Sequence, residues 1–182
     1  TLPNAGVATA YSTTLTATGG NGGPYSYTVV TGALPAGITL ATNGTLSGTP
    51  TAGGTFDFTL RAADTAGNTG ASGYTLVVSA PTISIAPTTL PTLTRNAAYS
   101  QTITAAGGTA PYSYAVTSGA VPAGVTLSPT GVLSGTPTTA GAYAFTVTAT
   151  DSSSGSGPYT GARGYSGTVQ QDTPVIGPTT LP

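Results

Sequence analysis

Residues 55–62 read Thr-Phe-Asp-Phe-Thr-Leu-Arg-Ala, so polar and apolar side chains alternate along the whole stretch. Successive side chains of a β-strand point to opposite faces of its sheet, and the alternation therefore predicts a strand with one buried face. Phe56, Phe58, Leu60 and Ala62 are expected to face a core. No window of the chain shows helical spacing of any length, which indicates an all-β fold.

The same pattern returns later in the chain. Residues 142–150 place Tyr143, Phe145, Val147 and Ala149 on one face of a second alternating segment. Shorter segments alternate likewise and are expected to point the following residues inward: Tyr11, Leu15, Tyr25, Tyr27, Val29, Tyr74, Tyr99, Ile103, Tyr112, Tyr114 and Val116. Short half-buried strands separated by Gly and Pro are typical of antiparallel sheets.

Two motifs show that a whole unit is repeated. Gly-Gly-Pro-Tyr-Ser-Tyr at residues 22–27 returns as Thr-Ala-Pro-Tyr-Ser-Tyr at residues 109–114, 87 positions later. Leu-Ser-Gly-Thr-Pro at residues 46–50 returns at residues 133–137 with the same spacing. A period of this length is a small domain rather than one turn of a solenoid.

We therefore predict two tandem Ig-like β-sandwich domains, residues 1–80 and 81–172, joined by a short linker near residues 79–81. Each domain is expected to have about seven short strands. Pro129 and Gly131 suit a type I turn closed by a left-handed residue, and the same turn is expected at residues 41–44. Pro50 and Pro137 are expected to end short edge strands, because proline cannot donate to a ladder.

The dipeptide Leu-Pro marks three points of the chain, at residues 2–3, 90–91 and 181–182. A Pro-rich segment, residues 81–91, leads to the second mark, and a similar segment, residues 174–182, leads to the third. The first domain lacks its own copy of this segment, which would be its first strand. Two interpretations stay open: residues 173–182 start the next repeat of a longer array, or they are a strand donated to another copy's first domain.

Charged groups are scarce, which excludes many functions. The chain has 182 residues with 3 Lys+Arg, 4 Asp+Glu, no His and no Cys, and a net charge of −1. Ser-His-Asp, Cys-His and metal-hydrolase sites are impossible with these residues, so we expect no enzyme activity and no catalytic residues. A near-neutral chain has no electrostatic hold on nucleic acid, and no apolar run is long enough for a membrane span.

The sequence offers a few candidate binding residues. Asp64 and Asp151 lie in loop-like sequences and are weak calcium candidates, but one carboxylate per loop is a poor supply for an ion that takes about 6–8 oxygens. The favoured interpretation is that they accept backbone hydrogen bonds in turns, so no cofactor is expected. Tyr159 and Tyr165 have no obvious core role and are candidates for inter-subunit contact, as are Pro174, Val175 and Ile176.

The ordered motifs resemble those of the bacterial putative-Ig repeat family, which is related to cadherin-like and dystroglycan-type repeats. They run Pro-Tyr-Ser-Tyr, Leu/Val-Pro-Ala-Gly, Gly-x-Leu-Ser-Gly-Thr-Pro, Ala-Gly-x-Phe/Tyr-x-Phe-Thr and Ala-x-Asp, in both repeats. The resemblance implies an exported, extracellular protein of the bacterial cell surface, such as an adhesin, a stalk or an appendage of a secreted enzyme. It carries no catalytic residues.

These observations predict a structural role. The chain is expected to act as a stiff spacer, or as the building unit of a filament in which copies join head to tail by strand donation. Its partners would be other copies or neighbouring repeats of the same chain. The alternative is an adhesin or a carbohydrate-binding accessory module of a secreted protein, with host or matrix glycan as its partner.

Overall fold

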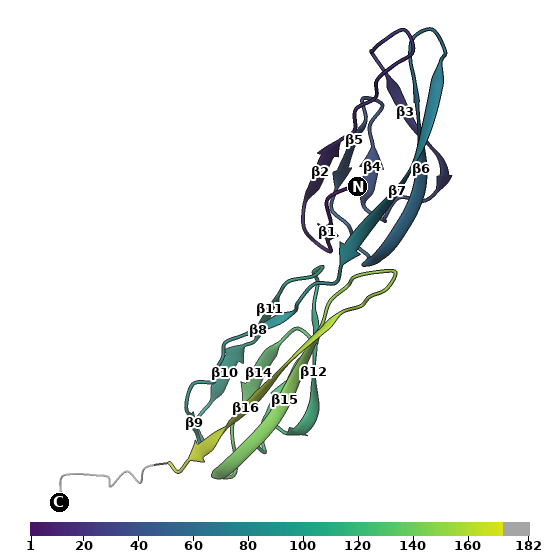
Figure 1. Ribbon diagram of the computed structural model, residues 1–182. Helices are drawn as coiled ribbons and strands as arrows, with labels where there is room; N and C mark the ends of the chain where they lie inside the picture. Colours follow the sequence, from purple (N-terminus) through teal and green to yellow (C-terminus); the bar gives the residue numbers. More distant parts are fainter. Residues whose placement is uncertain (173–182) are drawn as a thin grey trace, which may run out of the picture. The chain divides into compact units, whose positions relative to one another are not determined.

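The computed structural model describes residues 1–172, and the chain divides into two compact units (Figure 1). The first unit comprises Thr1–Thr82, Gly107–Pro111 and Asp151–Tyr159. The second comprises Ile83–Ala106, Tyr112–Thr150 and the described residues from Thr160 onward. The contact candidates Pro174, Val175 and Ile176 lie outside the described residues.

All regular structure in the described residues is β-strand, as the alternation predicts. The strands of the first unit are β1 (Ala5–Gly6), β2 (Tyr11–Thr14), β3 (Ser26–Gly32), β4 (Ile38–Leu40), β5 (Thr45–Gly48), β6 (Gly54–Ala63) and β7 (Thr69–Ser79). Those of the second are β8 (Ser84–Ala86), β9 (Leu93–Thr94), β10 (Tyr99–Thr102), β11 (Thr104–Ala106), β12 (Ser113–Ala120), β13 (Val125–Leu127), β14 (Val132–Gly135), β15 (Gly141–Thr150) and β16 (Thr160–Gln170). No helix capable of crossing a membrane occurs within residues 1–172.

Each unit has the two sheets of a sandwich. In the first unit the strand orders are β1-β7-β6-β3 and β2-β5-β4. In the second they are β12-β15-β16-β9 and β10-β14-β13, with a further pair β11-β8. The β1–β7 and β9–β16 pairs are parallel and all the others are antiparallel.

The core of the first unit lies between its sheets. Leu46 of β5 and Leu76 of β7 are fully buried, and Phe58 and Leu60 of β6 are each 3% exposed. Leu133, Phe145 and Val147 are buried at the equivalent places in the second unit. Residues 55–62 therefore point Phe58 and Leu60 inward, as expected, while Phe56 is half-buried. The full burial of a Phe or Leu side chain stabilises the unit by about 1.5–3 kcal/mol.

The turns form as the comparison of the two repeats predicts. The Gly44 amide donates to the Ala41 carbonyl and the Gly131 amide donates to the Ser128 carbonyl, both at 3.0 Å. Both glycines have left-handed backbones, with φ of 89° and 88°. A side chain other than glycine would be strained there, so glycine is what allows each strand pair to close.

Two expectations about the strands are wrong. Val29 is 38% exposed rather than inward, because it lies on β3, the edge strand of its four-stranded sheet, beside the point where the pairing with β6 shifts between Val29 and Thr31. A bulge of this kind interrupts the regular alternation of the side chains that follow it, such as Val30, which is 42% exposed. β5 and β14 end before Pro50 and Pro137, but each is the central strand of its three-stranded sheet and not an edge. The prolines lie beyond the paired residues, so their missing N–H removes no ladder bond.

Candidate functional site

In the second unit, β8 pairs with β11, the strand that follows β10. The described residues of the first unit include no strand in the equivalent position. In the second unit, residues 99–106 change partner at Ile103, because β10 pairs with β14 and β11 pairs with β8 (Figure 1). The β8–β11 pairs are Ala86 with Thr104, Ile85 with Ala105 and Ser84 with Ala106. Ile83 and Ile85 are only 8% and 4% exposed. β8 therefore completes the core of the second unit.

Side chains of β16 hold the segment that contains β8. The Tyr165 hydroxyl donates to the Pro87 carbonyl at 2.8 Å, and Arg163 Nε donates to the Ile85 carbonyl at 2.7 Å. Gly161 lies directly against Ile83, since a Cβ added at Gly161 would be 2.2 Å from the Ile83 carbonyl oxygen. A glycine is therefore required at this point of β16 for the segment to approach so closely.

The first unit has the same framework, but among residues 1–172 no strand occupies this position. The Leu15 amide donates to the Gly44 carbonyl at 2.9 Å, as the Ile103 amide donates to the Gly131 carbonyl at 2.7 Å. Residues 16–18 are therefore equivalent to β11. Nothing within the described residues forms a strand ladder with residues 16–18.

The register of β7 locates the other side of the open position. Tyr74 is opposite Phe58 and Gly70 is opposite Ala62, as Tyr165 is opposite Phe145 and Gly161 is opposite Ala149. Gly70 and Tyr74 are thus the equivalents of Gly161 and Tyr165. A Cβ added at Gly70 meets no described atom within 4 Å, whereas the same atom at Gly161 would collide with Ile83.

Exposure of the surrounding side chains agrees with this comparison. Leu15, Ala62 and Tyr74 are half-buried in the first unit. Their equivalents in the second unit, Ile103, Ala149 and Tyr165, are 1%, 0% and 4% exposed. We name the open position the strand groove: a cavity of about 310 Å³ whose walls include Thr16, Ala17, Tyr27, Leu60, Gly70 and Tyr74. It combines residues 16–18, which form no ladder with the described residues, with the side chains of Leu60 and Ala62, and this arrangement suits an extended peptide.

Asp64 lines the strand groove, and its carboxylate bonds to residues of the two loops beside it. Its carboxylate accepts hydrogen bonds from the amides of Asn21, Ala66 and Asn68 at 2.8–2.9 Å, and from Asn68 Nδ2 at 2.8 Å. These donors, the Asn68 side chain first among them, lower the pKa of Asp64 to about 2. Asp64 as a residue is 7% exposed, and loop amides rather than water stabilise the charge of its carboxylate.

Asp151 is held in the same way. Its carboxylate accepts hydrogen bonds from the amides of Thr109, Ser153 and Tyr159 and from the Ser153 hydroxyl. Burial raises its pKa, but these hydrogen bonds outweigh that effect and the pKa is lowered. Both Asp residues thus act as acceptors in turns, the interpretation that the sequence favoured over calcium. In the described part of the chain, no three His, Cys, Asp or Glu residues form a group that could hold a metal ion.

The tyrosine candidates are packed more closely than expected. Tyr165 is 4% exposed, and its ring lies 5.7 Å from that of Phe145. The expectation that it has no core role is therefore corrected, because β16 turns this side chain inward. Tyr159 is half-buried in the first unit, where its hydroxyl accepts a hydrogen bond from the Gly53 amide at 3.0 Å.

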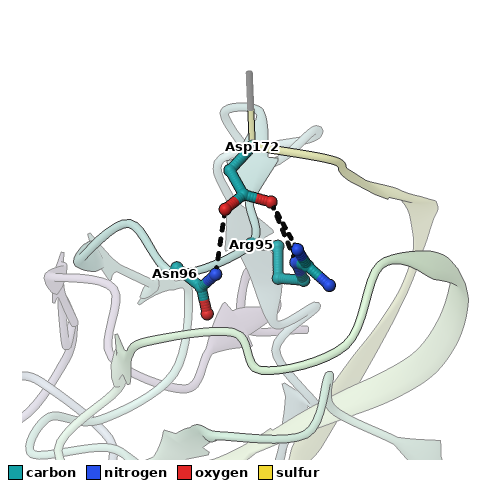
Figure 2. Close-up of polar contacts among 3 residues, drawn as sticks. All are labelled: Arg95, Asn96 and Asp172. Atoms are coloured by element: carbon teal, nitrogen blue, oxygen red, sulfur yellow. Dashed lines mark hydrogen bonds and ion pairs between the residues drawn. The ribbon is translucent and has the colours of Figure 1, made fainter. Parts of the chain in front are cut away.

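The last described residues of the second unit are anchored by polar contacts (Figure 2). Arg95 Nη2 lies 2.7 Å from Asp172 Oδ1, Arg95 Nε donates to the same oxygen at 2.9 Å, and Asn96 Nδ2 donates to Asp172 Oδ2 at 3.0 Å. Asn96 and Arg95 lower the pKa of Asp172. Residues 173–182 therefore come directly after Asp172, whose carboxylate is held by Arg95 and Asn96.

The sequence predicts that the first domain lacks a segment, but it does not point to the residues that border the open position. It did not single out Gly70, although Gly70 and Gly161 stand in the same place before Tyr74 and Tyr165. Comparison of the glycines between the repeats could have found this signal. The unpaired residues 16–18 were not foreseen either, because they read as an ordinary Thr-rich loop.

Comparisons with known proteins bear on the whole chain. A family model described as "Putative Ig domain" matches residues 1–79 and again residues 81–170. No curated protein matches. The solved structure of extracellular cadherin domains 3–6 of protocadherin gamma B2 is similar to this chain, with 17% sequence identity and a TM-score of 0.41. The match covers 86% of this chain and 44% of that chain.

Two further solved structures are similar at the same level. Mouse cadherin-23 EC22-24 is 14% identical with a TM-score of 0.39, covering 81% of this chain and 53% of that chain. Drosophila N-cadherin EC1-4 is 14% identical with a TM-score of 0.37, covering 82% and 41%. The chain spans about half or less of the length of these structures, and the likeness carries no argument about function.

Proposed function

The chain belongs to the Ig-domain family whose model matches both of its repeats, and on this premise we propose that it is a structural unit whose copies join head to tail by strand donation. Ig-like domains of this kind are generally non-enzymatic structural or adhesive modules. The observation that carries the proposal is the strand groove, which is open in the first unit while β8 fills its equivalent in the second.

The order of segments along the chain gives the direction of joining. The segment that contains β8 follows directly after β7, the last strand of the first unit. Residues 173–182 follow β16, the last strand of the second unit, in the same way. They would therefore open the unit that comes next, and in an assembly of identical chains this is the first unit of another copy. Contacts that link unlike surfaces in this way generate filaments when they do not close.

The proposed role is mechanical and the proposed location is the extracellular surface of a bacterium. The chain would act as a spacer or filament element and would need no reactive group, which agrees with the absence of His, Cys, Lys and Glu. A net charge of −1 gives weak self-repulsion between copies and so favours their association.

Electron microscopy and sedimentation velocity test this function. The intact chain is expected to form linear assemblies whose length grows with concentration, because residues 173–182 of one copy would enter the strand groove of the next. A variant that ends at Asp172 is expected to stay monomeric at the same concentrations. If the intact chain stays monomeric, or the truncated variant assembles equally well, head-to-tail donation is refuted.

A second candidate function is glycan binding in the same groove. Tyr25, Tyr27 and Tyr74 line it, and tyrosine rings are common platforms for sugars. The truncated variant, with no tail to compete, is the form to test on a glycan array. Glycan binding that Tyr74→Ala abolishes would favour the adhesin or accessory-module function. No binding to any glycan on the array would count against it.

A further inference from the structure

We infer that the strand groove receives residues 174–178 of a second copy as an antiparallel strand, in the register that residues 83–87 adopt in the second unit. This inference rests on the proposed head-to-tail function and adds the residues that meet. The groove of the second unit already holds β8, so residues 174–178 cannot enter there. The groove of the first unit is the equivalent position that is open among the described residues.

The two segments can be aligned on a shared ending. Residues 87–91 and 178–182 both read Pro-Thr-Thr-Leu-Pro. This alignment places Ile176 at the position of Ile85 and Pro174 at that of Ile83. Both inward positions of the donated strand are thus apolar, as they are in the filled unit. The position of Ile83 precedes the paired residues of β8, so the missing N–H of Pro174 removes no ladder bond.

The acceptor side follows from the equivalence of residues 16–18 with β11. The expected pairs are Gly177 with Thr16, Ile176 with Ala17 and Val175 with Thr18. The Tyr74 hydroxyl would donate to the Pro178 carbonyl, as Tyr165 donates to Pro87. Ser72 stands opposite Leu60 as Arg163 stands opposite Val147, so the contact from Arg163 has no counterpart. The donated strand is therefore held by one side-chain hydrogen bond fewer than β8.

Gly70 decides whether the strand can enter. In the filled unit the equivalent glycine lies against Ile83, and any side chain there would strike the segment's backbone. Gly70 itself is exposed, lies in β7 and has open space for a Cβ, so Gly70→Val is compatible with the fold of the first unit. Gly73→Val is the matched control, because a Cβ at Gly73 and one at the equivalent Gly164 both meet no described atom within 4 Å.

Intermolecular disulfide formation tests the register, since the chain has no cysteine of its own. Chains with Thr16→Cys are mixed with chains carrying Gly177→Cys or Val175→Cys. Directly opposite residues have Cβ atoms about 4.5–5.5 Å apart and diagonal ones about 7–8 Å, and a disulfide needs the shorter separation. We expect rapid cross-linking with Gly177→Cys and slow cross-linking with Val175→Cys. Thr104→Cys with Ala86→Cys in one chain is the positive control, because this pair is opposed in the second unit.

Adding Gly70→Val to the Thr16→Cys chain is expected to slow the cross-link by at least about tenfold, because overpacking against backbone is poorly relieved. Adding Gly73→Val is expected to leave the rate unchanged. Thermal unfolding of each variant confirms that it is folded. The inference is overturned if Gly177→Cys and Val175→Cys chains cross-link at equal rates. It is also overturned if Gly70→Val leaves the cross-linking rate unchanged.

The outcomes separate this inference from the proposed function. Linear assemblies that persist with Gly70→Val would support head-to-tail joining and refute the groove as its site. Register-specific cross-linking without linear assemblies would support the groove and refute the filament. Cross-linking only within single chains, shown by a monomeric product when Thr16→Cys and Gly177→Cys are combined, would refute a second copy as the occupant.

Discussion

At the scale of single residues, the two buried carboxylates organise the loops at the strand ends. Asp64 accepts four hydrogen bonds from three residues, and Asp151 accepts four from three others. Donors of this kind stabilise the ionised form, which is why the pKa of each group is lowered. The negative charge is therefore part of the folded structure.

The stability of the first unit should depend on pH through Asp64. Its pKa falls from an ordinary 3.8 to about 2 on folding, so the unfolded chain binds the proton more tightly. The contribution of Asp64 is fully present above pH 3.8 and is lost as the pH falls toward 2. We expect Asp64→Asn to lower the Tm at neutral pH and to flatten the decline of Tm over this range. An unchanged slope in the variant would contradict the assignment.

Calcium should leave the chain's stability unchanged. The Asp64 and Asp151 oxygens already accept amide and hydroxyl hydrogens, and binding an ion would require breaking those bonds. We expect the same Tm in millimolar calcium and in chelator. A Tm that rises with calcium, and an increase that Asp64→Asn removes, would show that the carboxylate is a metal ligand.

At the scale of elements, β8 closes the core of the second unit. Ile85 is 4% exposed, and its carbonyl accepts from Arg163. Ile85→Ala should lower the free energy of unfolding by about 2–5 kcal/mol, and Ile85→Val by about 0.5–1.5 kcal/mol. Urea denaturation of both variants measures the difference. Equal effects of the two substitutions would mean that the side chain is not packed as the structure shows.

Much of the element structure could be predicted because it depends on local periodicity. The alternation of residues 55–62 is enough to place β6, and Gly131 with Pro129 is enough to type a turn. The bulge at Val29 could not be predicted, because it depends on how β3 meets β6. The central place of β5 depends likewise on its two neighbours and not on its own residues.

For the candidate site, the sequence could predict only that a segment is missing from the first domain, and not which residues border the gap. Comparison of the repeats in the sequence predicts only that the segment at residues 81–91 has no counterpart in the first domain. Which residues border the open position depends on pairings that link residues far apart in sequence, such as Gly70 with Ala62. Burial differences between equivalent residues, such as Tyr74 and Tyr165, appear only in the folded units.

At the scale of the whole molecule, association should depend on apolar burial and backbone hydrogen bonds. The proposed contact residues Ala17, Pro174 and Ile176 carry no charge, and the net charge is −1. The association constant should therefore change by less than about threefold between low and high sodium chloride, because screening acts on exposed charges. Sedimentation equilibrium measures this. Strong weakening by salt would indicate a different, electrostatic interface.

The most direct test of strand donation is hydrogen exchange at residues 16–18, read against residues 104–106 of the same chain. The amides of residues 104–106 lie in β11 beside β8 and provide an internal standard for a paired strand. In associated intact chains, residues 16–18 should be protected to a similar degree, and removal of residues 173–182 should restore fast exchange there alone. Exchange at residues 16–18 that is the same with and without residues 173–182, in chains that still associate, would contradict the account.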